Sequence, residues 1–235
     1  MPCARLLSSL LFASLALISF TSVASAADAP KLKKGDRIVF LGDSITAAGA
    51  GPKGYISMIR EQLSAKHPDL AVECLGAGIS GNKVPDLQKR VEKDVIAKQP
   101  TIVVIYIGIN DVWHGEKDPA RGTDPERFDG GLREVIGKIT AAGARVVLCT
   151  PTVIGEKKEG ANSLDAKLDQ YADISRKVAK ELELPLCDLR KAFVTEIGAN
   201  NPDNAERGVL TSDRVHLNEA GNRFVAKTML ATLDP

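Results

Sequence analysis

Short apolar runs alternate with amphipathic stretches along most of the chain. The apolar runs are rich in β-branched residues and are bounded by Gly, Pro or Asp, which is the pattern of β-strands. We expect strands at Arg37–Leu41, Leu70–Leu75, Ile102–Ile107, Arg145–Thr150 and Leu186–Asp188. The first and third are continuous apolar runs, as in strands that are covered on both faces of a sheet.

The stretches between these runs place their apolar residues on one face of a helix. The residues that form such faces are Ile56, Ile59 and Leu63; Leu132, Val135, Ile136 and Ile139; Leu164, Leu168, Tyr171, Ser175, Val178 and Leu182; and Phe224, Val225, Met229 and Leu233. Asp124 followed by Pro125 predicts the N-cap and first residue of a helix. The alternation predicts a single three-layer α/β/α domain with about five mainly parallel strands.

The N-terminus has the pattern of a secretory signal peptide. Arg5 is followed by the uncharged apolar run Leu6–Phe20 and by small residues that end in Ala24-Ser25-Ala26. We expect residues 1–26 to be removed, which leaves residues 27–235 as a single exported domain, periplasmic or secreted, without stable membrane insertion. An uncleaved anchor is the alternative, but the run is short for a span of about 20 residues.

The charge balance and aromatic content of the chain indicate which classes of partner to expect. Lys and Arg number 31 against 30 Asp and Glu, and aromatic residues make up only 4%. Such a chain lacks the basic field and the stacking rings that gather nucleic acid, so no nucleic-acid partner is expected. Cys74, Cys149 and Cys187 lie in or beside apolar runs, which predicts buried thiols without a chemical role. Neither a metal nor a cofactor is expected.

Small polar clusters follow three of the predicted strands, and a fourth precedes the last helix. They are Gly42–Ser44, Gly76–Asn82, Gly108–Asp111 and Ser212–His216. Ligands of parallel α/β sheets bind beyond the carboxyl ends of the strands. The clusters therefore predict one site at that edge of the sheet.

The residue types in these clusters suit acyl transfer. Ser44 is the candidate nucleophile, His216 its base, and Asp213 the group that orients the imidazole. The backbone N–H groups of Ser44 and Gly81 and the side chain of Asn110 are candidate donors to a developing oxyanion. Each residue alone has a simpler interpretation as a cap, a turn or a surface ion pair, but their conjunction predicts a serine ester hydrolase.

Four motifs, FLGDSIT, GISGN, IGIND and DRVH, occur in this order along the chain. In this they resemble the SGNH hydrolases, the GDSL-type esterase/lipase superfamily. The resemblance implies a flavodoxin-like α/β/α sandwich and an acyl-enzyme mechanism without cofactor or metal. It also implies that Ser44, Asp213 and His216 are catalytic and that Ser44, Gly81 and Asn110 form the oxyanion hole.

The loops near these motifs bear on the substrate. Trp113 and His114 follow Asn110, and the Trp113 ring suits either stacking on a sugar face at the rim of the site or burial as a structural anchor. The polar stretch Gly155–Ser163 is expected to be a solvated loop. Since no long apolar lid segment is visible, we expect a short-acyl esterase, such as a carbohydrate O-acetylesterase that acts on small-molecule or carbohydrate esters.

Three alternatives remain open. The first is a lysophospholipase or thioesterase-type acyl hydrolase of the same superfamily, and the second is a non-catalytic carbohydrate-binding protein that keeps the fold. The third is a metal-dependent phosphoesterase with Asp43, Asp111, Asp213 and His216 as ligands, because carboxylates at several strand ends also suit divalent ions.

Overall fold

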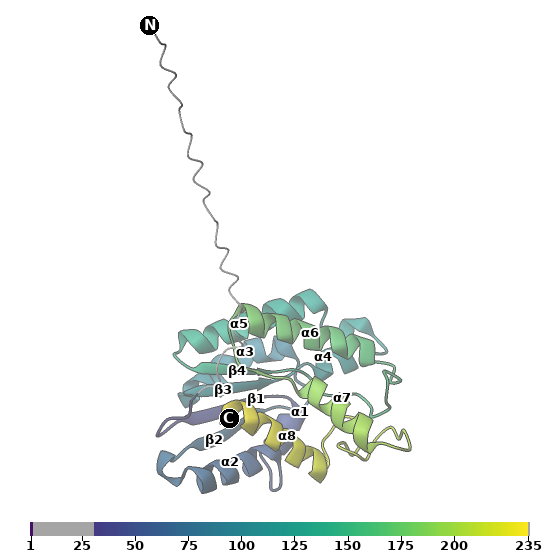
Figure 1. Cartoon of the computed structure of the whole chain (residues 1–235), viewed down its shortest axis with the longest axis horizontal. Coiled ribbons are helices and arrows are strands. Elements are labelled where there is room, and N and C mark those ends of the chain that lie inside the picture. Colours follow the sequence, from purple (N-terminus) through teal and green to yellow (C-terminus); the bar gives the residue numbers. More distant parts are fainter. Residues whose placement is uncertain (2–30, 235) are drawn as a thin grey trace.

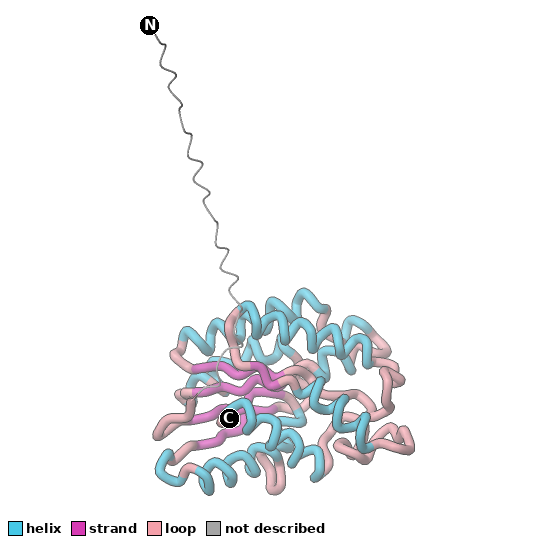
Figure 2. Tube along the Cα trace, in the orientation of Figure 1, coloured by secondary structure: helices cyan, strands magenta, loops and turns pink. Residues whose placement is uncertain are grey.

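A computed structural model describes Met1 and residues 31–234, so the expected signal peptide, residues 1–26, lies outside the described residues except for Met1. Its 5-stranded sheet is entirely parallel, with the order β2-β1-β3-β4-β5. The strands are β1 (Arg37–Gly42), β2 (Glu73–Gly78), β3 (Ile102–Tyr106), β4 (Arg145–Cys149) and β5 (Leu186–Cys187). Figure 2 shows them as a middle layer between helices.

Helices cover both faces of the sheet, which confirms the predicted three-layer α/β/α architecture (Figure 1). One layer contains α3 (Val84–Asp94), α5 (Pro125–Ala141) and α6 (Asp165–Glu181), and the other contains α2 (Tyr55–Lys66) and α8 (Glu219–Leu233). The remaining helices are α7 (Leu189–Asn200), which packs against α8, and the short helices α1 (Ser44–Gly49) and α4 (Ile109–Trp113). Single 3₁₀ turns lie at Pro68–Leu70, Ile96–Lys98 and Pro119–Arg121.

The strand order decides where a site can form. After β1 the chain adds β2 on one side of the sheet and then β3, β4 and β5 on the other side. The direction of winding therefore reverses between β1 and β3. The crevice at such a reversal is the usual ligand position in open parallel sheets. Helices α1 and α4 begin directly after β1 and β3, so the residues at their N-termini flank this crevice.

Several local predictions are confirmed. Asp124 caps α5 by accepting the N–H of Arg127, with Pro125 as the first helical residue. The predicted faces of α2, α5 and α8 are buried, apart from a half-buried Phe224. Cys74, Cys149 and Cys187 are buried free thiols. No helix in residues 31–234 is long and apolar enough to cross a membrane.

The predicted strand Leu70–Leu75 is wrong by three residues. Leu70 ends a 3₁₀ turn, and β2 starts only at Glu73 and continues through Gly76–Gly78, which pairs with the end of β1. These glycines resemble turn residues in the sequence, but their role is close packing. A Cβ at Gly78 would lie 2.6 Å from the carbonyl carbon of Thr46 in α1, and closer still to the next amide nitrogen.

The sequence pattern does not reveal helices α4 and α7 or the burial of one loop. Helix α4 has only five residues, too few for a periodic pattern, and the buried face of α7 is interrupted by Arg190. The stretch Gly155–Ser163 is only partly solvated, because Gly155 and Glu156 are buried. Glu156 is satisfied by distant backbone groups, which a polar local sequence does not reveal.

The contact between β2 and α1 gives a test of this packing. Gly78→Ala should lower the free energy of unfolding by about 3 kcal/mol, because the added methyl group collides with backbone rather than with a side chain that can move. The matched control is Gly130→Ala on the exposed face of α5, where nothing lies within 4 Å of the new methyl group. It should raise the free energy of unfolding by about 0.5–1 kcal/mol. Equal urea midpoints for the two variants would contradict this account.

Candidate active site

Ser44 is the first residue of α1 and lies at the carboxyl end of β1. The N-cap is the preceding residue, Asp43, whose Oδ1 accepts the N–H of Ile45 at 2.9 Å. The Ser44 hydroxyl therefore does not cap the helix. It is half-buried, and its Oγ lies 2.9 Å from Nε2 of His216.

His216 is held by Asp213 on its other side. Nδ1 of the ring lies 2.7 Å from Oδ2 of Asp213. Oδ1 of the same carboxylate accepts the N–H groups of Val215 at 3.1 Å and of His216 itself at 2.8 Å. One side chain thus fixes both the turn and the ring. With Nδ1–H donated to Asp213, Nε2 presents its lone pair to the Ser44 hydroxyl.

The charge on Asp213 is stabilised by these contacts. Partial burial alone would raise its pKa, but the hydrogen bonds from the His216 ring and from the two N–H groups lower the pKa below its ordinary value. The His216 and Asp213 side chains are 37% and 48% exposed. The hydrogen-bonded chain therefore lies at the molecular surface, where a substrate can reach it.

The loop after β2 is tied to the ends of β1 and β3. Ile79 donates its N–H to the carbonyl of Gly42, at the end of β1. Asn110, in α4 after β3, donates from Nδ2 to the carbonyl of Asn82 at 3.1 Å. Gly81 lies between these ties, is exposed, and has a φ of +77° that only glycine adopts readily. The structure thus places Gly81 and Asn110 on neighbouring, connected segments.

Arg90 and Asp111 hold the same loop and were not identified from the sequence. Arg90 donates to the carbonyl of Gly42 at 2.8 Å and to Oδ1 of Asn82 at 2.6 Å. Asp111 Oδ1 accepts the N–H of Val84 at 3.1 Å, where α3 begins. No sequence pattern connects Arg90 with the end of β1, because Gly42 lies 48 residues away. For Asp111, the sequence suggests only a role as ligand in the metal-dependent alternative.

Two buried carboxyl groups lie behind the exposed residues. Burial and, to a smaller degree, the nearby Asp111 carboxyl together raise the pKa of Asp43 to about 7, against the opposing effect of the N–H of Ile45. Burial likewise raises the pKa of Asp111 to about 6.

The ligands of the metal-dependent alternative have other partners. Asp43 caps α1, Asp111 holds α3, and Asp213 holds His216. Residues 31–234 contain no group of three or more His, Cys, Asp or Glu side chains that could hold a metal ion.

Trp113 and His114 border the site. The Trp113 ring meets the His216 ring edge-on, with centroids 6.5 Å apart and an interplanar angle of 67°. A Cβ on Gly81 would lie 3.9 Å from Cε1 of His114. Burial, followed by the charges of Lys83 and Arg121, lowers the pKa of His114, which favours a neutral ring. Trp113 thus lies beside His216, and His114 lies beside Gly81.

Comparison with known proteins gives concordant matches. Residues 40–224 match the model of the GDSL-like Lipase/Acylhydrolase family. An acetylxylan esterase from Geobacillus stearothermophilus is 31% identical over 214 residues, which span 85% of this chain and 94% of that protein.

Solved structures agree. The crystal structure of the acetyl xylan esterase AlAXEase is 45% identical in sequence with a TM-score of 0.80, covering 83% of this chain and 98% of that chain. A second similar structure is a catalytic mutant of an acetylxylan esterase from Geobacillus stearothermophilus, in which a serine is replaced by alanine. It is 29% identical with a TM-score of 0.78, covering 87% of this chain and 97% of that one.

The raised pKa of Asp43 predicts how stability changes with pH. An Asp whose pKa rises from 3.8 to about 7 on folding keeps its proton in the native state after the unfolded chain has lost it. Its contribution to stability is therefore present at low pH and is lost as pH rises from about 4 to about 7, by roughly 4 kcal/mol in total. Asp43→Asn keeps the oxygen that caps α1 but does not titrate.

Urea unfolding of the wild type and of Asp43→Asn between pH 4.5 and 8 measures this effect. The free energy of unfolding of the variant should fall by about 3 kcal/mol less than that of the wild type across this range. The control is Asp203→Asn at an exposed position, which should follow the wild-type curve. Parallel curves for all three proteins would show that Asp43 is not the source of the dependence.

Proposed function

The chain belongs to the GDSL-like lipase/acylhydrolase family and is an ester-bond hydrolase, and we propose that it uses Ser44 to remove short acyl groups, above all acetyl, from carbohydrates. The family membership confirms the resemblance seen in the four motifs. The observation that carries the proposal is the hydrogen-bonded chain from Ser44 through His216 to Asp213. The acetylxylan esterases among its relatives support the choice of substrate.

The geometry supports a two-step acyl transfer. As the Ser44 hydroxyl attacks the ester carbonyl, Nε2 of His216 takes its proton, and Asp213 stabilises the imidazolium that forms. The imidazolium then protonates the leaving alcohol as the tetrahedral intermediate collapses to an acyl-enzyme. His216 next takes a proton from water, the hydroxide attacks the acyl carbon, and the proton returns to Ser44 Oγ as the acid leaves.

The proposed oxyanion donors come from three segments. Ser44 is the first residue of α1, so its own N–H is one of those left free at a helix N-terminus, where the helix dipole favours negative charge. Gly81 offers a second backbone N–H without a side chain in the way. Asn110 Nδ2 has two protons and uses one on the carbonyl of Asn82, which leaves the other for the substrate.

A carbohydrate ester suits the surroundings of Ser44. Trp113 lies against His216 and is partly exposed, so its ring can contact the apolar face of a sugar whose acetyl group reaches Ser44. His114, beside Gly81, offers a neutral ring that can donate and accept hydrogen bonds with hydroxyl groups. We assign the substrate as an O-acetylated carbohydrate such as acetylated xylan or its oligosaccharides.

Export is part of the proposal. It rests on the apolar run Leu6–Phe20 and the small residues that end at Ala26 in the sequence. A polysaccharide substrate is consistent with it, because such polymers are met outside the cell. The mature enzyme then comprises residues 27–235.

Acyl-chain selectivity tests the proposal. The purified mature enzyme should release acetate from acetylated xylo-oligosaccharides and should hydrolyse p-nitrophenyl acetate faster than the octanoate. Ser44→Ala should lower kcat by about 10⁴-fold or more, because no other group replaces the nucleophile. The control Ser163→Ala, at an exposed position, should keep wild-type turnover. Turnover that survives in Ser44→Ala would contradict the nucleophile, and equal rates on acetate and octanoate would contradict the acyl preference.

Asn110→Ala tests the oxyanion hole. The change removes a donor that acts mainly in the transition state, so kcat should fall by about 10²–10³-fold, or roughly 3 kcal/mol, with little change in KM. Asn200→Ala at the exposed end of α7 is the control and should match the wild type. Steady-state kinetics on p-nitrophenyl acetate measures both constants. A rise in KM at constant kcat would instead indicate that Asn110 only binds substrate.

A further inference from the structure

Glu156 is completely buried, with 0% of its surface exposed. Its carboxylate accepts three backbone N–H groups, those of Val209 at 2.7 Å, Leu210 at 2.8 Å and Thr211 at 2.5 Å. A carboxylate is an acceptor only, so its oxygens match three backbone donors. The residues that it holds lie immediately before Asp213 in the sequence.

Gly155 forms a second tie to the same region. Its N–H donates to the carbonyl of Arg214 at 2.8 Å. Arg214 lies in the turn between Asp213 and His216 and has a φ of +85°, a conformation that side-chain-bearing residues rarely adopt. The bond from Gly155 therefore helps to hold the one strained residue of that turn.

Position 155 itself requires glycine. Its φ is +103°, and a Cβ would lie 2.8 Å from Cγ of Asn162 and closer still to Oδ1. The N–H that reaches Arg214 thus depends on the absence of a side chain at this position.

The segment that receives these ties is irregular. Residues 201–218, the α7–α8 segment, contain no helix and no strand beyond one isolated bridge between Thr211 and Leu217. Asn201, at its start, donates from Nδ2 to the carbonyl of Glu156 at 2.7 Å. The N–H of Glu156 also donates to the carbonyl of Glu206 at 2.9 Å. The conformation of this segment therefore depends on individual ties rather than on a regular ladder.

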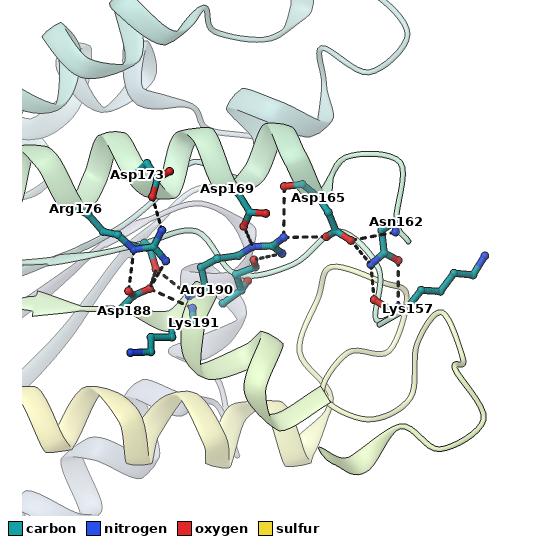
Figure 3. A network of polar contacts seen from close by, with 11 residues as sticks. Lys157, Asn162, Asp165, Asp169, Asp173, Arg176, Asp188, Arg190 and Lys191 are labelled. Atoms are coloured by element: carbon teal, nitrogen blue, oxygen red, sulfur yellow. Dashed lines mark hydrogen bonds and ion pairs between the residues drawn. The ribbon is translucent and has the colours of Figure 1, made fainter. Parts of the chain in front are cut away.

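Residues 150–164, the β4–α6 loop, supply these ties. Hydrogen bonds with residues of α6 and α7 hold this loop in turn (Figure 3). Asn162 closes it by bonding the backbone N–H and carbonyl of Lys157 at 3.1 and 2.8 Å. Asn162 also donates to Asp165, whose other oxygen pairs with the buried Arg190 at 2.9 Å. Arg190 donates in turn to the carbonyl of Thr152 at 3.1 Å. Gly155 and Glu156 thus belong to a loop whose conformation is held by hydrogen bonds.

We propose that Gly155 and Glu156 are positioning residues for catalysis: they hold the α7–α8 segment so that Asp213 and His216 stay aligned with Ser44. Neither residue touches the reacting atoms. The inference rests on the proposed function, in that it assigns these ties to the same site. Loss of the Glu156 ties lets His216 move away from Ser44, and a displacement of about 1 Å at a catalytic group lowers turnover by as much as 10²-fold.

Glu156→Gln is the most direct test. It keeps the shape, but it replaces one acceptor oxygen with an N–H group that cannot accept from the backbone. We expect kcat on p-nitrophenyl acetate to fall by about 10²-fold with KM changed by less than about threefold, because alignment and not substrate binding is lost. The matched control is Glu159→Gln, the same change at an exposed position of the same loop, which should keep wild-type kinetics.

Stability measurements separate alignment from folding. A merely structural role would lower the urea midpoint of Glu156→Gln and leave kcat per folded molecule unchanged, and that result would overturn the inference. If Glu156→Gln does not fold, Glu156→Asp provides the second variant, since it keeps the charge but is one methylene too short to reach all three N–H groups. It should show the same selective loss of kcat to a smaller degree, and wild-type kcat in a folded Glu156→Asp would overturn the inference.

A readout without turnover distinguishes this inference from the proposed function. The proton on Nδ1 of His216, hydrogen-bonded to Asp213, gives a low-field NMR signal that is identified by its loss in His216→Ala. It should shift or disappear in Glu156→Gln and stay in place in Glu159→Gln. Absence of esterase activity in the wild type would contradict the proposed function, whereas an unchanged Nδ1 signal in Glu156→Gln would overturn the positioning role, whatever the activity.

Discussion

The hydrogen bond between Ser44 Oγ and Nε2 of His216 joins residues 172 positions apart in the chain. Several carboxyl groups around the site hold the segments that carry these two residues. The end of β1 and the Asp43 cap of α1 fix the position of Ser44. His216 has no such support, because it lies in an irregular segment just before α8. The fold therefore has to hold Ser44, the proposed nucleophile, against His216, the proposed base, whose own backbone is not part of a helix or strand.

Carboxyl groups that accept backbone N–H groups solve this problem at each point of the site. Asp43 holds the start of α1, Asp111 the start of α3, Asp213 its own turn, and Glu156 the residues that lead into that turn. A single carboxyl side chain can fix a turn or a helix start in this way, because its oxygens accept hydrogen bonds from backbone N–H groups. Where the carboxyl is buried and near another, as for Asp43, burial raises its pKa against the effect of the backbone N–H group and makes stability depend on pH.

The sequence predicted the parts of the site whose signal is local. The sheet follows from apolar runs such as Ile102–Tyr106, and Ser44, Asp213 and His216 follow from short motifs at strand and helix ends, which the structure joins by hydrogen bonds. Their catalytic roles and that of the oxyanion donors remain predictions. The placement of Gly76–Gly78 after the strand was wrong, because glycine serves both loops and close approach of backbones, and only the position of α1 decides between them.

Residues that act on distant backbone left no trace in the sequence. Glu156 stands in a stretch as polar as a surface loop, yet its three partners lie more than 50 positions further on, at separations of 53, 54 and 55 residues. Arg90 similarly reaches back 48 residues to Gly42. A backbone N–H or carbonyl is the same at every residue, so no side-chain pattern marks it as a partner. The ties from Gly155 and Glu156 to the α7–α8 segment do not involve Trp113 or His114, so the residues proposed to contact the substrate are separate from those proposed to align Asp213 and His216.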